Sequence, residues 1–421
     1  MLSEVVRSPR AELGHGARIA AGVLALFAFE RLAALALAAV RVAFPSSVAA
    51  MLGCFAVMLG LRGFAPAGAE RLSAALSPAL RFLSRWMAIF FVPPLVLLPL
   101  TPVPPAGTAL SVALVVVGGV PVTALFTGWL ASRLGAPEVS ATPVTSPGRE
   151  WPRRWVVSLW ALILLASVAA WQWAHAAPAR AGLGVALAVL GFVLGEAVRE
   201  HLSARVRGPL SAFLHPVLVS GVIAYYGFRG LGFAPAQFLE PGASPGRLLM
   251  AMLSPSVAAL GFALDRERNL LRQGAIVLCL TTLASAAFSL FATALCVRLL
   301  GVHEPYARAL LPRSVTTPVA LAIASELHAN PGLTAVFVIT SGVLGALFAP
   351  ALLRRAGLAS SFTLGVATGA SCHGIGTAAL VRGEPAAAAV SGISFALTAA
   401  MSVALVSVPG VRAALLALLG H

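Results

Sequence analysis

Nearly continuous apolar stretches recur along this chain, and they limit the folds that it can adopt. One of them runs from Trp155 to Ala170 without a charged residue. A membrane-spanning helix needs about 20 apolar residues to cross a hydrocarbon core about 30 Å thick, whereas the strands of a transmembrane barrel alternate apolar and polar residues. The unbroken runs therefore predict an all-α polytopic membrane protein.

The composition excludes the main alternatives. Hydrophobic residues make up 59% of the 421 residues and charged residues only 10%, against about 25% charged residues in an average soluble domain. Too little charge remains to cover the surface of a soluble enzyme of this length, and disordered chains have low hydrophobicity. A soluble enzyme and a disordered chain are both ruled out.

A window of about 20 residues predicts about twelve transmembrane helices. They lie at 19–40, 46–61, 86–100, 108–131, 155–174, 181–198, 210–228, 248–264, 273–299, 332–351, 361–380 and 386–408. A further apolar segment, 312–326, is short and bounded by prolines. We predict that it is a re-entrant or broken helix, because proline removes a backbone hydrogen bond from a helix.

Every basic residue other than the histidines is an arginine, and the net charge is +15. Such a charge suits a polyanionic partner such as nucleic acid, but it also arises when arginines anchor cytoplasmic loops. The arginines lie at span ends and not along one stripe, which favours the second interpretation and no nucleic-acid partner. With the N-terminus inside, 20 arginines fall in cytoplasmic segments, including Arg354, Arg355 and Arg412, and 8 fall outside. Both termini are therefore predicted to be cytoplasmic.

The longest polar stretch of the chain, 134–154, is rich in proline, serine and threonine. This composition is typical of a linker. The sequence thus predicts a four-span domain at 1–133, a linker at 134–154 and an eight-span domain at 155–421.

Catalytic and metal-binding patterns are nearly absent. The four cysteines form no C-x-x-C pair and lie in apolar segments, so we predict that they are buried hydrophobic residues. Cys372 alone adjoins polar residues and stays a candidate site residue. One G-x-S-x-G sequence occurs at 242–246, but Pro245 has no N–H to offer an oxyanion hole. We predict no enzyme activity, no catalytic residue, no metal and no cofactor.

Three segments interrupt the apolar pattern with clustered polar residues: 253–260, 311–320 and 369–377. Each contains residues that break helices, namely Pro255, Pro312, Pro318, Gly374 and Gly376. In lipid, unwound backbone survives only where it is buried in protein or lines a cavity, and transporters place substrate sites at such interruptions. The first two segments share a faint pattern, Ser256-Val257 against Ser314-Val315, which suggests inverted repeats in the C-terminal half.

The richest cluster of hydrogen-bond donors consists of Arg313, Ser314, Thr316 and Thr317. A guanidinium and three hydroxyls could hold a small carboxylate through charge-assisted hydrogen bonds. Alternatively, the hydroxyls cap the re-entrant helix and Arg313 extends to the membrane surface. The residues alone leave both interpretations open.

His373 lies in the middle of a predicted span. A lone buried histidine is most often a structural hydrogen-bond donor, and its functional interpretation is a group that contacts substrate or carries a proton, because imidazole titrates near neutral pH. Ser371, Thr377 and Ser256 complete the set of candidate substrate-binding residues.

Two of these segments resemble motifs of a known family. Residues 311–320, LPRSVTTPVA, resemble the P-K-S-V-T-T-P motif of the LrgB/CidB family, with Arg313 in place of lysine. Residues 369–378, GASCHGIGTA, resemble its A-S-H-[AG]-I-G-T-A motif, with Cys372 as the departure. The likeness covers roughly 155–415, and further departures occur at Ser254, Ala322 and His215.

The N-terminal half is similar to the LrgA/CidA family at residues 44–60 and 90–100, so the chain resembles a fusion of the two families. The resemblance implies a transporter of small monocarboxylates such as glycolate, glycerate or pyruvate. The families also carry an older assignment as holin- or antiholin-like regulators of murein hydrolases and lysis. A holin needs only oligomerising apolar helices, so the interrupted polar motifs favour the transporter.

We therefore predict alternating-access transport, coupled to protons or running by exchange. The substrate carboxylate would contact Arg313 and the N-terminal end of the 312–326 helix, and His373 would face Ser371 and Thr377 across the site. The expected partners are a small carboxylate, protons and the lipid bilayer. The N-terminal half would be a scaffold or would form a homodimer. The first 18 residues are short for a transit peptide, which favours a bacterial inner membrane over a plastid envelope.

Overall fold

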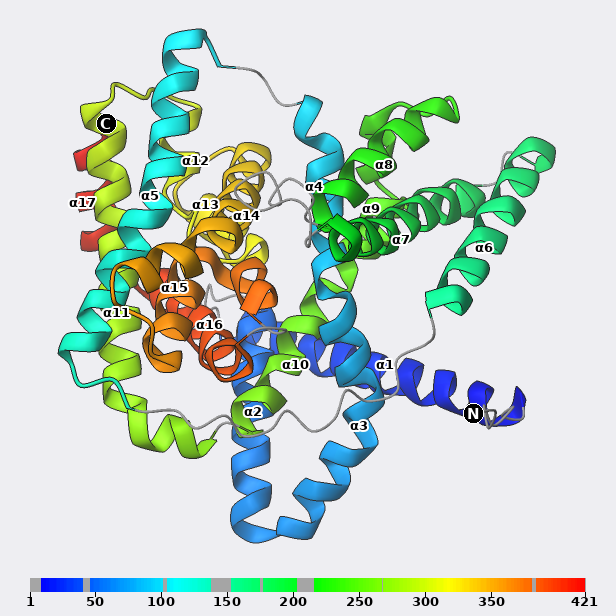
Figure 1. Cartoon of the computed structure of the whole chain (residues 1–421), viewed down its shortest axis with the longest axis horizontal. Coiled ribbons are helices and arrows are strands. Elements are labelled where there is room, and N and C mark those ends of the chain that lie inside the picture. Colours follow the sequence, from blue (N-terminus) through cyan, green and yellow to red (C-terminus); the bar gives the residue numbers. More distant parts are fainter. Residues whose placement is uncertain are drawn as a thin grey trace. The chain divides into compact units, whose positions relative to one another are not determined.

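The computed structural model describes residues 9–40, 46–100, 104–137, 153–174, 177–202, 216–266, 268–380 and 384–420. No strand occurs among these residues (Figure 1), which confirms the all-α prediction. The α-helices, in chain order, are α1 (Pro9–Ala39), α2 (Ser46–Phe64), α3 (Pro66–Trp86), α4 (Val92–Leu97), α5 (Ala106–Arg133), α6 (Arg153–Ala174), α7 (Ala177–Leu202), α8 (Pro216–Gly230), α9 (Pro245–Ala251), α10 (Leu253–Arg266), α11 (Arg268–Leu299), α12 (Tyr306–Leu310), α13 (Thr317–Glu326), α14 (Pro331–Arg355), α15 (Ser361–Leu380), α16 (Pro385–Ser407) and α17 (Pro409–Leu419). The short 3-10 helices are η1 (Met87–Phe91), η2 (Leu98–Leu100) and η4 (Pro235–Leu239).

Nine helical segments in the described part of the chain are long and apolar enough to cross a membrane. The predicted number of about twelve is not confirmed, and three predicted spans account for the difference. Segment 86–100 consists of the short pieces η1, α4 and η2, because its prolines prevent a continuous helix. The described part of segment 210–228 belongs to α8, which has only 15 residues, and the first residues of the segment lie outside the described part. Segment 361–380 is interrupted at His373.

The chain divides into two compact units. Unit 1 comprises Met1–Met87 and Met252–Arg266, and unit 2 comprises Ala88–Ala251 and Glu267–His421. The interrupted motif at 253–260 therefore belongs to α10 of unit 1. The division into 1–133, 134–154 and 155–421 stays a prediction, since most of the linker lies outside the described residues.

In unit 1, α10 packs tightly against α2. A Cβ atom on Gly261 would overlap the carbonyl oxygen of Met51, so only glycine allows this approach. At the ends of the two helices, Arg62 holds both carboxylate oxygens of Asp265, with Nε and Nη2 each 2.7 Å from one oxygen. Asp265 is buried and is the only aspartate in the chain. This ion pair ties the isolated segment 252–266 to the N-terminal helices.

Arg62→Ala is expected to lower the thermal unfolding midpoint of the detergent-solubilised protein. Asp265 would remain as a buried charge without its partner, and breaking such a pair costs about 3–5 kcal/mol. Arg62→Lys keeps the charge but loses the two-pronged geometry, so its loss should be smaller. Arg71→Ala, at an exposed arginine of α3, is the matched control. An equally large fall for the control would contradict the role of the pair.

The broken helix predicted at 312–326 is a helical hairpin in unit 2. α12 leads into a turn at 311–316, and α13 follows it. Arg308 on α12 donates from Nη1 to the carbonyl oxygen of Leu327, just beyond α13, at 3.5 Å. The two arms therefore lie side by side, and the chain leaves the hairpin where it entered. Pro318 sits in the first turn of α13, where a missing N–H is harmless.

α15 forms a second hairpin instead of the straight span that the sequence predicts. Its backbone is non-helical at His373, with φ 44° and ψ −148°. A Cβ atom on Gly376 would lie 3.0 Å from Cγ2 of Thr368, although eight residues of straight helix span about 12 Å. The chain thus doubles back at His373.

Neighbours on α14 and α5 confirm the reversal. Before the break, Ala367 and Leu353, near the C-terminal end of α14, both lie next to Gly128 of α5. Further along the same arm, Cys372 lies against Gly345, in the middle of α14. After the break, Leu380 lies beside the C-terminal part of α14 again, because both line one cavity. We call 361–372 the incoming arm and 374–380 the outgoing arm of this hairpin.

The two hairpins enter unit 2 from opposite ends. α14 connects the open end of the first hairpin to the open end of the second (yellow to orange in Figure 1). α11 with the first hairpin and α14 with the second therefore repeat one pattern in opposite directions. The inverted repeat suggested by the sequence stays a prediction. In the structure its two candidate tips are the turn at 311–316 and the break at His373, whereas segment 253–260 belongs to unit 1.

The second hairpin also changes the arrangement of the arginines. Arg412 on α17 bonds to Glu326 at the end of the first hairpin, whereas Arg354 at the far end of α14 pairs with Glu384 at 2.8 Å. Since α14 is about 37 Å long, Arg412 and Arg354 lie at opposite ends of unit 2. The structure thus separates these two arginines, which the sequence assigned to the same side. The cause is that 361–380 returns to the side from which it came. The cytoplasmic location of both termini stays a prediction.

Candidate functional site

Arg313 lies at the tip of the first hairpin and is 2% exposed. Its Nε donates to Oγ1 of Thr293 on α11 at 3.1 Å, and its Nη2 donates to Oγ1 of Thr123 on α5 at 3.3 Å. A Cβ atom on Gly119 would overlap the guanidinium, so this glycine makes room for it. The interpretation that Arg313 extends to the membrane surface does not match this geometry.

The Arg313 charge has no acidic partner among the described residues, and its Nη1 has no hydrogen-bond partner there. An isolated charge buried in protein costs several kcal/mol, and intramembrane charges normally pair. The remaining donor and the missing negative charge can both be supplied by one carboxylate. The tip of the first hairpin is therefore a candidate anion site.

The hydroxyls next to Arg313 are placed differently from one another. Ser314 accepts a hydrogen bond from Ser289 of α11 at 2.9 Å. Thr316 is the N-cap residue of α13, but its side chain makes no capping hydrogen bond. Thr317 is buried, and its Oγ1 has no partner in the described part of the chain. Thr317 is thus the hydroxyl most in need of a ligand.

His373 lies at the tip of the second hairpin and is fully buried. Its Nε2 lies 3.0 Å from the carbonyl oxygen of Val338 on α14, and a Cβ atom on Gly342 would overlap the ring. Its Nδ1 has no partner among the described residues. The structural interpretation explains one ring nitrogen and leaves the other for a ligand or a proton.

Both tips meet at the middle of α5. Arg313 contacts Gly119 and Thr123, and Cys372 belongs to an apolar cluster that contains Val120 and Ala124. Two interrupted segments 60 residues apart in the sequence are thereby brought to one turn of α5. The structure therefore joins the Arg313 and His373 motifs in one region.

The other predicted site residues make local contacts. Ser371 donates to the Ala367 carbonyl oxygen at 2.6 Å, and Thr377 lies 2.8 Å from Oγ of Ser391 on α16. Ser256 bonds to the Met252 carbonyl oxygen within unit 1. The binding roles of these three serines and threonines stay predictions. Among the predicted helix breakers, Pro255 lies in the first turn of α10, and Pro312 lies in the turn at 311–316 of the first hairpin. Gly374 and Gly376 lie in the outgoing arm of the second hairpin.

Residues that the motifs do not include complete the surroundings of Arg313. α5 contributes Thr123 and Thr127, and α11 contributes a row of hydroxyls four residues apart, at Ser285, Ser289 and Thr293. All five are buried, and Thr127 lies 2.7 Å from Ser285. Hydroxyls at this spacing on an apolar helix share one face, and that spacing was the signal available in the sequence.

A model of the LrgB-like family matches residues 188–409, a range that contains both hairpins and their tips. This chain belongs to the LrgB-like family. The LrgB/CidB resemblance of the two motifs is thereby confirmed. As a member of this family with nine membrane-length apolar helices in its described part, the chain is an integral membrane protein.

Relatives of the LrgB-like chain include named transport and holin-like proteins. The chain is 30% identical over 405 residues to the plastidal glycolate/glycerate translocator 1 of Arabidopsis thaliana. This alignment covers 91% of the present chain and 78% of the translocator. It is 26% identical over 196 residues to the holin-like protein CidB of Staphylococcus aureus, which covers 47% of this chain and 84% of CidB. No solved structure matches. These two relatives are named as a translocator and a holin-like protein, and not as enzymes.

Proposed function

We propose that this LrgB-like chain is a secondary transporter of small monocarboxylates of the glycolate, glycerate or pyruvate type. The observation that carries the proposal is the buried Arg313 guanidinium without an acidic partner among the described residues. A substrate carboxylate would supply the missing charge and accept a hydrogen bond from Nη1. The name of the Arabidopsis relative, a glycolate/glycerate translocator, supports the substrate class.

The remaining groups at the two tips suit a short hydroxy acid. The unpartnered Oγ1 of Thr317 would bond the 2-hydroxyl of the substrate, with Ser314 and Thr316 beside it. His373 would contact the substrate or carry a coupling proton through its free Nδ1. Ser371 and Thr377 hold the backbone on either side of His373. Proton symport and exchange are both compatible with this arrangement.

The opposed hairpins support alternating access. In this mechanism each hairpin would close the path from its own end of unit 2, and their tips would meet at the substrate. Displacement of one hairpin at a time would open the site to one side only, as inverted repeats of broken helices do in other transporters.

Uptake by proteoliposomes tests the proposal. Purified full-length protein is reconstituted, and uptake of labelled glycolate, glycerate and pyruvate is measured with and without a pH gradient. Saturable uptake of at least one acid, competed by the others, is the expected result. A holin-like lysis regulator is the second candidate, because the CidB relative carries that name. Release of large trapped solutes without saturable carboxylate uptake would support the holin-like function and contradict transport.

Gly119→Ala is expected to reduce carboxylate uptake by about tenfold or more, because the added methyl group would displace the Arg313 guanidinium from the site. Gly118→Ala is the matched control, since a Cβ atom there meets nothing within 4 Å. Initial rates at low substrate concentration provide the measurement. Equal rates for the two variants would show that the position of Arg313 does not matter.

The C-terminus is expected on the non-cytoplasmic side of a bacterial inner membrane. Four further arginines lie at the same end of unit 2 as Arg354, namely Arg133, Arg268, Arg272 and Arg355. By the positive-inside rule, this end is expected to face the cytoplasm. Arg412 and α17 lie at the other end. An impermeant thiol reagent should reach a cysteine appended after His421 from outside intact cells, but should not reach Ala359→Cys. The reverse pattern would invert the orientation.

A further inference from the structure

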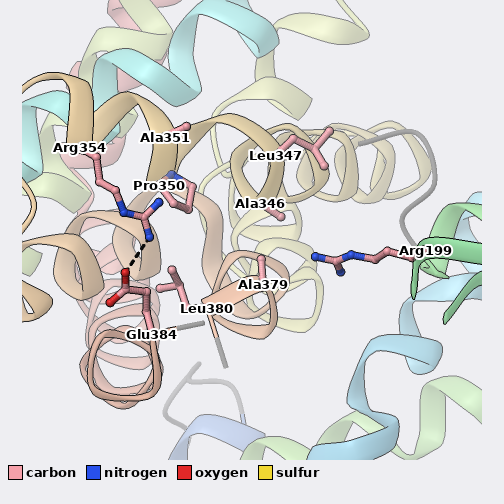
Figure 2. A pocket seen from close by; sticks show the side chains of 9 residues that line it. All are labelled: Arg199, Ala346, Leu347, Pro350, Ala351, Arg354, Ala379, Leu380 and Glu384. Atoms are coloured by element: carbon pink, nitrogen blue, oxygen red, sulfur yellow. Dashed lines mark hydrogen bonds and ion pairs between the residues drawn. The ribbon is translucent and has the colours of Figure 1, made fainter. Parts of the chain in front are cut away.

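A cavity of about 220 Å³ lies at the Arg354 end of unit 2. Figure 2 shows its walls, which come from α14, from the outgoing arm of the second hairpin and from α7. Most lining side chains are alanine, leucine and proline. Three charged residues, Arg199, Arg354 and Glu384, also line the cavity. A space this size accommodates a two- or three-carbon acid.

The charges of the cavity favour an anion. Arg354 and Glu384 form an ion pair at 2.8 Å, but their side chains are 45% and 35% exposed. Ion pairs this exposed are weak because water screens them, so an incoming carboxylate can compete with Glu384. Arg199 extends from α7 toward the other lining residues (Figure 2) and has no ion pair or hydrogen bond with any described residue. The lining therefore contains two guanidinium groups and one carboxylate.

The cavity lies beside the second hairpin, whose tip belongs to the candidate anion site. Ala346 lines it and directly follows Gly345, which contacts Cys372 at the second tip. Gly342, which contacts the His373 ring, is one helical turn further along α14, or about 6 Å from Ala346. Glu384 occupies the N-cap position of α16 without a side-chain capping bond, and its backbone N–H donates to the carbonyl oxygen of Leu380, at the end of the outgoing arm, at 2.8 Å. An anion that captures Arg354 would therefore release the end of the second hairpin.

We propose that this cavity is a second, weaker binding site for small carboxylates, where Arg199 attracts the anion and the anion displaces Glu384 from Arg354. The inference rests on the proposed function, because it treats the cavity as the entrance to the site at Arg313. It adds a binding residue, Arg199, that lies outside both sequence motifs.

Protection of a cysteine from labelling tests this site separately from transport. Ala351→Cys places a thiol on the exposed wall of the cavity. Cys279 and Cys296 are changed to alanine, because they are exposed and not buried as the sequence predicts. Glycolate should slow modification by a thiol reagent about threefold or more relative to potassium chloride of equal ionic strength. The protection should persist with Arg313→Gln and disappear with Arg199→Gln. Arg229→Gln, at an exposed arginine of α8, is the matched control and should keep the protection.

The outcomes separate the two proposals. Protection that depends on Arg313 but not on Arg199, or no protection at all, would overturn the second site. Protection that depends on Arg199 without any saturable carboxylate flux would uphold the second site while transport fails. As a check that needs no cysteine variant, glycolate should raise the unfolding midpoint of Arg313→Gln but not that of the Arg199→Gln/Arg313→Gln double variant. A shift that survives in the double variant would likewise overturn the proposal.

Discussion

Arg313→Gln is expected to abolish saturable carboxylate uptake, with a loss of about 100-fold or more, because it removes the one positive charge that the described residues place at the hairpin tips for the substrate carboxylate. Its stability should move the other way. The guanidinium is buried without an acidic partner among the described residues, so removing it also removes an uncompensated charge. The unfolding midpoint should therefore stay constant or rise while uptake disappears.

Two further variants make the Arg313 test specific. Arg313→Lys restores the residue of the motif that this segment resembles and keeps the charge, so it should retain most of the uptake. Arg308→Gln removes an arginine from the same hairpin whose charge is already paired with Glu304 at 3.1 Å, and it should transport normally. A large fall in the unfolding midpoint of Arg313→Gln, with uptake scaling to the folded fraction, would make Arg313 a structural residue.

His373→Ala and His373→Gly are expected to differ, although both remove the imidazole. The backbone at His373 has φ 44°, which glycine adopts freely and residues with a Cβ adopt at a cost of about 1–3 kcal/mol. The glycine variant should therefore have the higher unfolding midpoint of the two. Both variants should lose the response of uptake to a pH gradient if the imidazole carries the coupling proton.

The pair of His373 variants separates the fold from the chemistry. Equal stability of the two would contradict a chain reversal at this residue. A glycine variant that folds and still responds fully to the pH gradient would remove His373 from the coupling mechanism. A glycine variant that folds but has lost substrate affinity, with the pH response intact, would make His373 a substrate contact.

Much of the site was predictable because its signals are local. Pro312 and Pro318 break a helix wherever they occur in an apolar segment, and the polar residues around Arg313 and His373 are too costly in lipid to lie there without a role. The surroundings were not predictable to the same degree. Gly119, Thr123 and the hydroxyl row of α11 are separated from Arg313 by between 20 and 194 residues of chain, and no local pattern states that they meet it.

The sequence by itself determined the membrane class, the all-α architecture, the LrgB-like motifs and the candidate residues Arg313 and His373. Only the tertiary structure decided that 361–380 turns back. A hydropathy window measures how apolar a segment is, and a re-entrant pair of arms is as apolar as a single crossing. The reversal depends instead on packing of the tip against Gly342 and Gly345, and that contact places the two hairpins at opposite ends of unit 2.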